Sequence, residues 1–400
     1  MDKRIRIAGI VGAIIFAILI WVSPSNPPPI PEPTTEYGNE YVQILATNLE
    51  KPWAIDFAGD KIFVTEKAGQ VRVIESGVLL DDPLATLRTA NVFGGGLLGI
   101  AVHPAFDNNH FIYVYYTYEK DGVLWNKILR ITESNNKLDA AKTIFDKIPG
   151  SAYNNGGIMK FGPDGKLYVG TGYVSDSHGP QDIQSLEGKI LRLNDDGTIP
   201  DDNPFSDSPV FSFGHMNTKG LGWDNEGSLF VTEMGPSKND EINLVQPGGN
   251  YGWPEQECSG NEQFIDPINC YDPAIEPGGI VFYYDDKINL RGGDPGSSVV
   301  CIPNTAPTPE NCFATPYQIP KGNCSSYVHH LVLATLRGSH LFNLEICEGE
   351  VESQVSILSG LGRIRDVAVG PDGYLYLITS NTDGKGFPDG SDDKLLRIVK

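Results

Sequence analysis

Six pairs of short apolar runs repeat along this chain, and they restrict its fold more than any other feature. The first run of each pair covers 62–65, 112–115, 167–170, 229–232, 331–334 or 375–378. The second run, after a turn, covers 70–73, 127–131, 189–193, 240–244, 340–344 or 394–398. Short runs rich in β-branched and aromatic residues are typical of strands buried on both faces. The chain is therefore predicted to be built from paired strands.

The spacing of the pairs predicts how the strands are arranged. A repeat of roughly 40 to 60 residues made of strands, with almost no helical periodicity, is typical of blades around a central axis. Turn segments placed just before strands agree with this, as in Gly162-Pro163-Asp164-Gly165 and Gly370-Pro371-Asp372-Gly373. We predict an all-β fold, a six-bladed β-propeller, with a β-sandwich as the alternative.

The composition excludes several classes of protein. The 400 residues include 45 Gly and 29 Pro, and 40% of them are hydrophobic, which suits a turn-rich β protein with a large core rather than a disordered chain. The net charge of −21 argues against a nucleic-acid partner, because phosphates require a basic surface. The motifs of common nucleotide-binding proteins, zinc proteases and serine hydrolases are missing from the sequence.

The N-terminal segment is typical of an exported protein. Lys3, Arg4 and Arg6 precede an uncharged apolar run, 7–22, whose length lies between that of a signal-peptide core and that of a membrane span. We therefore predict a transmembrane anchor or signal at 1–22, a Pro-rich linker at 23–39 and the propeller at 40–400. Basic residues before the run keep that end in the cytoplasm. The propeller is expected to be extracytoplasmic, either secreted or held at the membrane by its N-terminal segment.

All six cysteines lie between Cys258 and Cys347. An even number of cysteines in a chain with an export signal favours disulfides, and six cysteines allow 15 connectivities. The nearest-neighbour scheme pairs Cys258 with Cys270, Cys301 with Cys312 and Cys324 with Cys347, and it is one of these alternatives. The blade repeat is also interrupted here, which predicts a disulfide-bearing insertion at about 255–327.

A series of short motifs covers the chain from about Leu49 to its C-terminus. They are Lys51-Pro52-Trp53-Ala54-Ile55, Val64-Thr65-Glu66-Lys67, Gly95-Gly96-Leu97-Leu98-Gly99, Gln181-Asp182-Ile183-Gln184-Ser185, Asp202-Asn203-Pro204-Phe205, Thr232-Glu233-Met234-Gly235-Pro236, Asn250-Tyr251-Gly252-Trp253-Pro254 and Gly362-Arg363-Ile364-Arg365-Asp366. In this order they resemble the PQQ-dependent glucose/sorbosone (soluble aldose sugar) dehydrogenase family. Each motif alone is weak, whereas the ordered set is specific.

The resemblance implies a six-bladed propeller with PQQ over the channel mouth and an active-site Ca²⁺. It implies oxidation of a sugar or alcohol hydroxyl, with hydride passing to PQQ and then electrons to an external acceptor. Matched position by position, Asn217, Arg363 and Arg365 correspond to family residues near the cofactor, and Arg337 stands where a Lys is common. Gly235 and Pro236 match the residues whose carbonyls hold Ca²⁺. Cationic side chains suit the carboxylates of PQQ, and oxygen ligands suit a hard cation.

Four positions of the predicted channel mouth depart from the family pattern. Asn154 stands in the place of the catalytic His, and an amide cannot accept a proton at neutral pH. Met216 replaces an Arg, Gly94 replaces a Gln or Glu, and Tyr173 replaces an Asp. Other candidate bases are His178, in the same loop as Asp176, and His215, whose alternative role is to hold its loop.

Two hypotheses follow from these matches and departures. The first is an exported PQQ-dependent sugar dehydrogenase, an oxidoreductase that uses Ca²⁺. The second is a catalytically degenerate propeller that binds a saccharide or a surface partner. Convergence of Asn217, Arg337, Arg363 and Arg365 on one open mouth would favour the first, whereas a mouth filled by Met216 and Tyr173 would favour the second.

Overall fold

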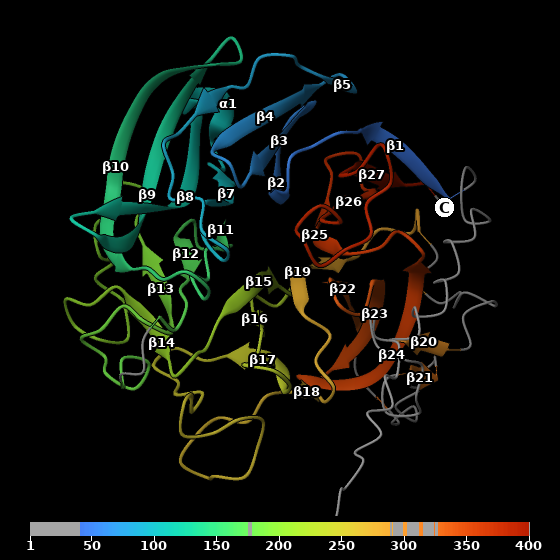
Figure 1. Cartoon of the computed structure of the whole chain (residues 1–400). Helices are drawn as coiled ribbons and strands as arrows, with labels where there is room; N and C mark the ends of the chain where they lie inside the picture. The colour runs from blue at the N-terminus through green and yellow to red at the C-terminus, as the bar shows by residue number, and fades with distance from the viewer. Residues whose placement is uncertain are drawn as a thin grey trace, which may run out of the picture. The chain divides into compact units, whose positions relative to one another are not determined.

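The computed structural model describes residues 41–174, 178–288, 290, 299–301, 312–314, 324 and 327–399. Six antiparallel sheets are arranged around a central axis in this part of the chain (Figure 1). The predicted six-bladed β-propeller is confirmed. The predicted anchor or signal and the linker, 1–39, lie outside the described residues. No helix in the described part of the chain is both long and apolar enough to span a membrane.

Each blade contains at least four strands, which are numbered here as in Figure 1. The first blade contains β2 (Pro52–Ala58), β3 (Lys61–Glu66), β4 (Gln70–Glu75), β5 (Val78–Leu79) and β6 (Ala85–Thr86). The second contains β7 (Leu97–Val102), β8 (Phe111–Lys120), β9 (Val123–Ser134) and β10 (Lys137–Pro149), with helix α1 (Phe106–Asn109) between β7 and β8. The third contains β11 (Met159–Phe161), β12 (Leu167–Gly170), β13 (Lys189–Leu193) and β14 (Val210–Phe213).

The remaining blades complete the ring. The fourth blade contains β15 (Thr218–Trp223), β16 (Leu229–Glu233), β17 (Asp240–Val245) and β18 (Asn269–Tyr271). The fifth contains β19 (Pro277–Tyr283), β22 (His329–Thr335), β23 (His340–Cys347) and β24 (Glu350–Ser359). The sixth contains β25 (Ile364–Val369), β26 (Leu375–Thr379), β27 (Leu395–Ile398) and β1 (Val42–Ala46). Because β1 pairs with β27, both ends of the described chain share one sheet and close the ring.

The paired runs found in the sequence are the second and third strands of each blade. The innermost strands β2, β7, β11, β15, β19 and β25 precede them and contact one another around the axis (Figure 1). In five of these strands the register with the second strand shifts near the first residues. The residues at three of these shifts are Trp53, Lys219 and Arg365. Such bulges redirect a side chain, and here they occur at the same end of neighbouring strands.

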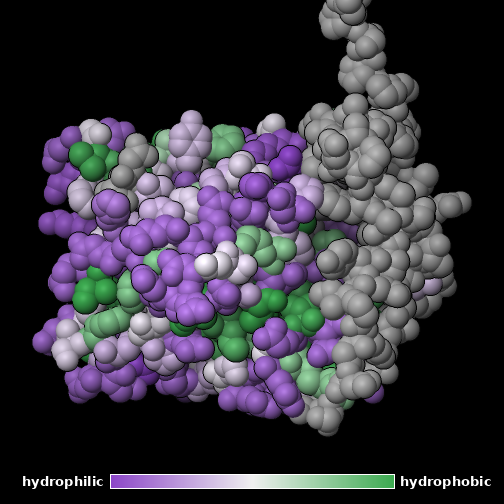
Figure 2. Space-filling view, turned by 90° about the horizontal axis from the view of Figure 1, so that it is seen from below, coloured by the Kyte–Doolittle hydropathy of each residue, from purple (hydrophilic) through white to green (hydrophobic). Residues whose placement is uncertain are grey.

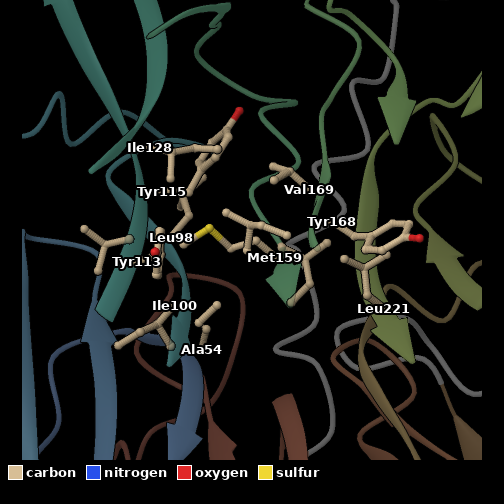
Figure 3. Packing of buried hydrophobic residues seen from close by; sticks show 14 of the residues in the cluster. Ala54, Leu98, Ile100, Tyr113, Tyr115, Ile128, Met159, Tyr168, Val169 and Leu221 are labelled. Atoms are coloured by element: carbon tan, nitrogen blue, oxygen red, sulfur yellow. The ribbon is translucent and has the colours of Figure 1, made fainter. Parts of the chain in front are cut away.

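Apolar side chains fill the space between neighbouring blades. Figure 3 shows residues from β2, β7, β8, β9, β11, β12 and β15 in one contact region, including Ala54, Leu98, Met159 and Leu221. These four side chains are almost completely buried. By contrast, the side of the protein drawn in Figure 2 is mostly hydrophilic, with smaller apolar patches. The core therefore holds the innermost strands in place and leaves the loops at their ends free to form a site.

Two of the three expected disulfides lie within the described residues and are confirmed. Cys258 is bonded to Cys270, and Cys324 is bonded to Cys347. Cys301 and Cys312 are register partners in the small sheet of β20 (Val299–Cys301) and β21 (Cys312–Ala314). Their bond stays a prediction, because nothing of their side chains is described.

The predicted insertion at about 255–327 contains two strands of the ring. Within this range β18 is the outer strand of the fourth blade, and β19 is the innermost strand of the fifth. The sheet of β20 and β21 lies in the segment between β19 and β22. The interruption of the blade repeat therefore falls inside the fifth blade.

Candidate functional site

Asn217, immediately before β15, connects several segments that carry predicted site residues. Its side chain is fully buried, and its Nδ2 donates to Oδ1 of Asn154 at 3.2 Å. Its Oδ1 accepts the N–H of Gly156 at 3.1 Å, and its carbonyl accepts the N–H of Met234 at 3.1 Å. Met234 directly precedes Gly235 and Pro236. Asn217 thus joins the Asn154 position to the proposed Ca²⁺ turn.

The loop that carries Asn154 is held by the neighbouring Asn155. The Asn155 side chain is fully buried; its Nδ2 donates to the carbonyls of Gly94 and Ser151, and its Oδ1 accepts from Asn126 Nδ2. A Cβ atom at Gly94 would overlap the carbonyl oxygen of Tyr153. The Gln or Glu expected from the family at position 94 therefore does not fit this loop path, which explains why glycine stands there.

A group of basic side chains, here called the basic cluster, comes together near the bulges of the innermost strands. It consists of Lys67, Lys219, Arg363, Arg365 and Lys385. Asp383 lies 2.9 Å from Arg363 and 3.7 Å from Arg365, and Glu276 lies 2.8 Å from both Arg363 and Lys385. Glu276 and Asp383 thus pair with three of these five cations, and Asp366 is a further carboxylate near Arg365. The Nε of Arg365 is buried without a hydrogen-bond partner in the described part of the chain, which suits an anionic ligand.

The pKa values in this region reflect the excess of positive charge. Burial, with smaller contributions from Arg365, Lys67 and Lys385, lowers the pKa of Lys219 to about 7. Burial and Arg365 likewise lower the pKa of Lys67 to about 8. Burial alone would raise the pKa of Glu276, but Arg363 and Lys385 outweigh it and bring the value to about 2. The cluster therefore lacks negative charge, and a bound anion would supply it.

Lys219 and Arg365 reach this cluster from bulges in different blades. Nζ of Lys219 lies 5.8 Å from the ring centre of Trp53, which stands at the corresponding bulge of β2. A Cβ at Gly278, in β19, would overlap the carbonyl oxygen of Arg365, so these strands approach closely at the same level. The irregularities therefore place Lys219, Arg365 and Trp53 at a common level of the innermost strands.

Arg337 is joined to the same region through its backbone. Its N–H donates to the carbonyl of Ile275 at 2.9 Å, beside the Glu276 whose carboxylate binds Arg363. The Arg337 side chain is half-buried. Asn154, Asn217, Arg337, Arg363 and Arg365 therefore lie on connected segments at one end of the ring, although their roles stay predictions.

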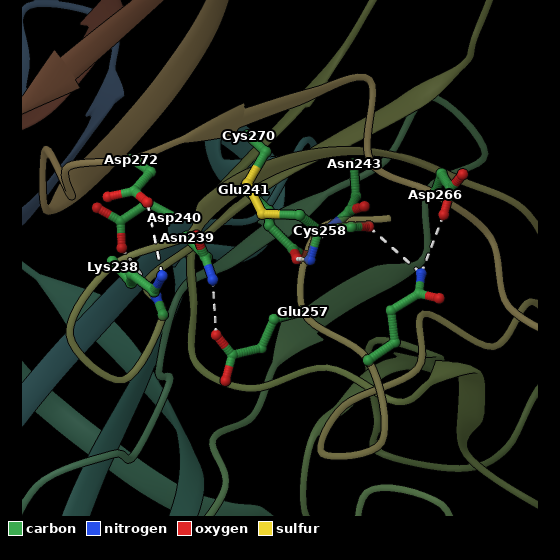
Figure 4. The surroundings of a disulfide bond; sticks show 12 residues. Lys238, Asn239, Asp240, Glu241, Asn243, Glu257, Cys258, Asp266, Cys270 and Asp272 are labelled. Carbon is green, nitrogen blue, oxygen red and sulfur yellow. Dashed lines mark hydrogen bonds and ion pairs between the residues drawn. A yellow bond between two sulfur atoms is a disulfide. The ribbon is translucent and has the colours of Figure 1, made fainter. Parts of the chain in front are cut away.

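Oxygen atoms surround the turn at Gly235 and Pro236. The N–H of Gly235 donates to Asp240 Oδ1 at 2.8 Å, and a small pocket beside the turn is lined by Glu233, Glu241 and Glu257. Burial and the nearby Glu233 raise the pKa of Glu241 to about 8. The disulfide from Cys258 to Cys270 lies next to this segment (Figure 4).

A hard cation suits this oxygen-rich turn. The predicted ligands are the backbone carbonyls of Gly235 and Pro236. No group of three or more His, Cys, Asp or Glu side chains arranged for a metal occurs among the described residues.

The two histidines considered as replacement bases lie in different surroundings. His215 is fully buried; its Nδ1 lies 2.5 Å from Glu233, and its Nε2 lies 2.8 Å from Ser212 Oγ. Its ring stacks on Tyr251, so that both ring nitrogens are engaged in holding the loop. His178 is exposed, and its carbonyl accepts the N–H of Gln181. Asp176 lies outside the described residues.

Met216 and Tyr173 lie beside the predicted site. Tyr173 donates its N–H to the carbonyl of Met216 at 2.6 Å, and its ring packs edge-on against Trp253 at 5.6 Å. Met216 is buried and lines the pocket at Gly235 and Pro236. Tyr173 follows β12 of the third blade and Met216 precedes β15 of the fourth, whereas four members of the basic cluster belong to the first and sixth blades and Lys219 belongs to the fourth.

Comparison with known proteins assigns the chain to a family. The family model described as glucose/sorbosone dehydrogenase matches residues 49–294 and 316–397. The chain belongs to the glucose/sorbosone dehydrogenase family. This confirms the resemblance found in the sequence motifs.

Two curated relatives match most of the chain. The aldose sugar dehydrogenase YliI of Escherichia coli is 29% identical over 86% of this chain and 91% of its own length. Quinoprotein glucose dehydrogenase B of Acinetobacter calcoaceticus is 28% identical, with 87% of each chain covered. The PQQ-bound aldose sugar dehydrogenase structure from Streptomyces coelicolor is 32% identical, with a TM-score of 0.73 over 90% of this chain and 97% of its own.

Sequence reasoning identified Arg363 and Arg365 but missed three members of the basic cluster, Lys67, Lys219 and Lys385. Lys67 ends one of the quoted motifs, and Lys219 follows Asn217 by two residues. These motifs do not indicate that the two lysines lie near Arg365. Lys219 nevertheless places a cation three residues after Met216.

Proposed function

We propose that this protein is a PQQ-dependent sugar dehydrogenase that oxidises a hydroxyl group of an aldose or related compound. The basic cluster is the observation that carries the proposal, because it holds more positive charge than Glu276 and Asp383 neutralise. PQQ has three carboxylates, and Arg and Lys are suited to bind them. When bound, PQQ would accept hydride from the substrate carbon.

The residues present fit the cofactor and its cation. Arg363, Arg365, Lys67 and Lys219 would bind the carboxylates, and the buried Nε of Arg365 would gain a hydrogen-bond partner. The carbonyls of Gly235 and Pro236 would hold Ca²⁺, and Asn217 would keep this turn beside the Asn154 position.

We further propose an extracytoplasmic location, with the N-terminal segment at the membrane, and electron transfer to an external acceptor.

Titration of PQQ into the purified protein with Ca²⁺, followed by calorimetry, tests the proposal directly. We expect Ca²⁺-dependent binding that is weakened about 10- to 100-fold in the Lys219→Met variant, because a charge-assisted hydrogen bond is lost. Lys137→Met, which changes an exposed lysine of β10, is the matched control and should bind as the parent does. If PQQ did not bind to the parent protein, the dehydrogenase proposal would be wrong and a saccharide-binding or partner-binding propeller would be favoured.

The affinity for PQQ is expected to fall as the pH rises from about 6.5 to about 9. In the protein without ligand the pKa of Lys219 is lowered to about 7 and that of Lys67 to about 8. Bound carboxylates raise both pKa values, so the complex takes up protons, and binding weakens where the lysines are neutral. Calorimetry in two buffers of different ionisation enthalpy measures this uptake. Binding that is equally tight, or tighter, at the higher pH would contradict the assignment of these lysines.

A further inference from the structure

A cavity lies between the fourth and fifth blades, at the end of the ring opposite the basic cluster. Strand β19 begins beside Glu276, which binds Arg363, and ends at Tyr283, whose register partner is His330. His329, the first residue of β22, therefore lies at the far end, and it lines the cavity. The cavity has a volume of about 340 Å³, which is enough for a small organic molecule. None of its described lining residues belongs to the proposed cofactor site.

Carboxylates from both blades line this cavity. Asp224 and Glu226 lie in the turn between β15 and β16, and Glu348 follows β23. Oδ1 of Asp224 accepts the N–H groups of Glu226 and Ser228 at 3.0 and 2.8 Å, which fixes this carboxylate in the turn. The imidazole of His329 is the one basic group among the lining residues that the structure describes. The cavity therefore favours a positively charged ligand.

Aromatic and apolar side chains form the other walls. The ring centre of Tyr327 lies 5.2 Å from that of His329, and the two ring planes are inclined by 81°. Phe230, Leu244 and Ile346 also line the cavity. A hard metal ion needs oxygen ligands on every side, which apolar groups do not supply. Aromatic rings attract an ammonium group, so these walls suit an organic cation better than a metal ion.

His329 is a buried side chain with one ring nitrogen that lacks a hydrogen bond. The side chain is only 7% exposed. Its Nδ1 lies 3.1 Å from the hydroxyl of Tyr284, which also accepts the N–H of Asn225 at 2.8 Å. Its Nε2 lies 3.7 Å from Oε1 of Glu226, too far for a hydrogen bond, and it makes none with the described residues. Buried polar groups are rarely left unpaired, so Nε2 is available to a group bound in the cavity.

The disulfide between Cys324 and Cys347 holds two walls of the cavity. Cys347 directly precedes Glu348, and Cys324 lies three residues before Tyr327. One covalent bond therefore restrains both segments. Because the walls are restrained in advance, less conformational entropy is lost when a ligand binds.

We propose that this cavity binds a small organic cation, a primary ammonium ion that carries a short alkyl chain. The ammonium group lies between Glu226 and Nε2 of His329 and donates its N–H groups to both. The ring of Tyr327 covers the cation, and the alkyl chain contacts Phe230. The charge is essential, because a neutral ligand of the same shape does not compensate the carboxylates. This site goes beyond the proposed dehydrogenase function and does not depend on it.

Butylammonium and its neutral analogue butanol test the proposal, because they have the same alkyl chain and differ in charge. Saturation-transfer NMR on the purified protein measures both affinities. We expect butylammonium to bind with a Kd on the order of 1 mM or tighter, and butanol to bind at least about 10-fold more weakly. If butylammonium did not bind, or if butanol bound equally well, the proposal would be overturned.

Two variants of the cavity and two matched controls locate the binding. Tyr327→Ala and Glu226→Gln are each expected to weaken butylammonium binding about 5- to 10-fold, because each removes an attraction for the cation. Tyr153→Ala and Glu119→Gln change exposed residues outside the cavity and should bind as the parent does. Weakening of the same size in the controls would contradict the assignment.

Titration of PQQ separates this cavity from the proposed cofactor site. PQQ should not displace butylammonium, and its affinity should be the same in the parent, Tyr327→Ala and Glu226→Gln. If butylammonium binds and PQQ does not, the dehydrogenase function fails and the cation site stands. Displacement of butylammonium by PQQ would show that the cation binds elsewhere, and the cavity assignment would be wrong.

Discussion

Replacing Lys189 by methionine is expected to lower the free energy of unfolding by about 3 kcal/mol, because it leaves buried carbonyl groups without donors. Lys189 is fully buried at the start of β13. Its Nζ donates to the carbonyls of Gly179, Pro180 and Glu187 at 2.7, 3.0 and 2.5 Å. These bonds fasten the loop before β13, and methionine keeps the length of the side chain but donates to none of them. Denaturant unfolding at pH 7 measures the change.

The difference between the parent and Lys189→Met should grow as the pH rises above 7. Burial lowers the pKa of Lys189 from its ordinary value of 10.5 to about 7. Between these two values the unfolded chain binds more protons than the folded one, so stability contributed by this site rises with pH. Unfolding at pH 7 and pH 9.5, with Lys137→Met as a control, separates this effect from the titration of other groups. A neutral or stabilising Lys189→Met change would contradict the role assigned to the three carbonyls.

The Asn154→His variant is expected to raise kcat for sugar oxidation by about 100-fold or more, because it supplies a proton acceptor at the reacting hydroxyl. The imidazole nitrogen would accept the proton of the substrate hydroxyl. Asn217 Nδ2 lies 3.2 Å from Asn154 Oδ1, so it is placed to orient a new side chain at this position. Steady-state rates with a dye acceptor measure the gain.

Asn154→Gln is the matched control for this variant. Glutamine adds one methylene but no basic atom, so it should not increase the rate. The affinity for PQQ should be similar in all three proteins, because Asn154 is not part of the basic cluster. If Asn154→His binds PQQ but shows no increase in kcat, the substrate pocket differs from that of the family by more than the missing base. That result would favour the alternative of a degenerate propeller.

The strands that could be predicted are those with strong local patterns. In β3, β12, β16 and β26, nearly every residue is apolar or β-branched, and nearly every one is buried. The innermost strand β15, Thr218–Trp223, contains two glycines and a register shift, which weaken the alternation expected of a strand. The outer strand β18 has only three residues, all half-buried. Such strands form because their neighbours supply hydrogen-bond partners, and no local pattern reveals them.

For the candidate site too, features that depend on neighbouring residues in the chain could be predicted, and features that depend on tertiary contacts could not. The motifs around Gly235 and Arg363 are continuous in the chain, and the residues alone identify them. The engagement of both ring nitrogens of His215 depends on Ser212 and on Glu233 in a different strand, β16. His215 therefore remained a candidate base until the fold showed that it is buried. Similarly, the sequence indicates only that a polar side chain is missing at Gly94. The structure gives the reason, because a Cβ at this position would overlap the carbonyl oxygen of Tyr153.

By itself, the sequence determined the repeated strands, the turns, the six blades and the family to which the chain belongs, because these depend on local preferences and on ordered motifs. The tertiary structure alone decided which charges meet. Lys67, Lys219 and Arg365 come from three blades and lie far apart in the chain, and their lowered pKa values arise only when the ring closes around them. Electrostatic interactions depend on distance through space and on burial, and closure of the ring determines both.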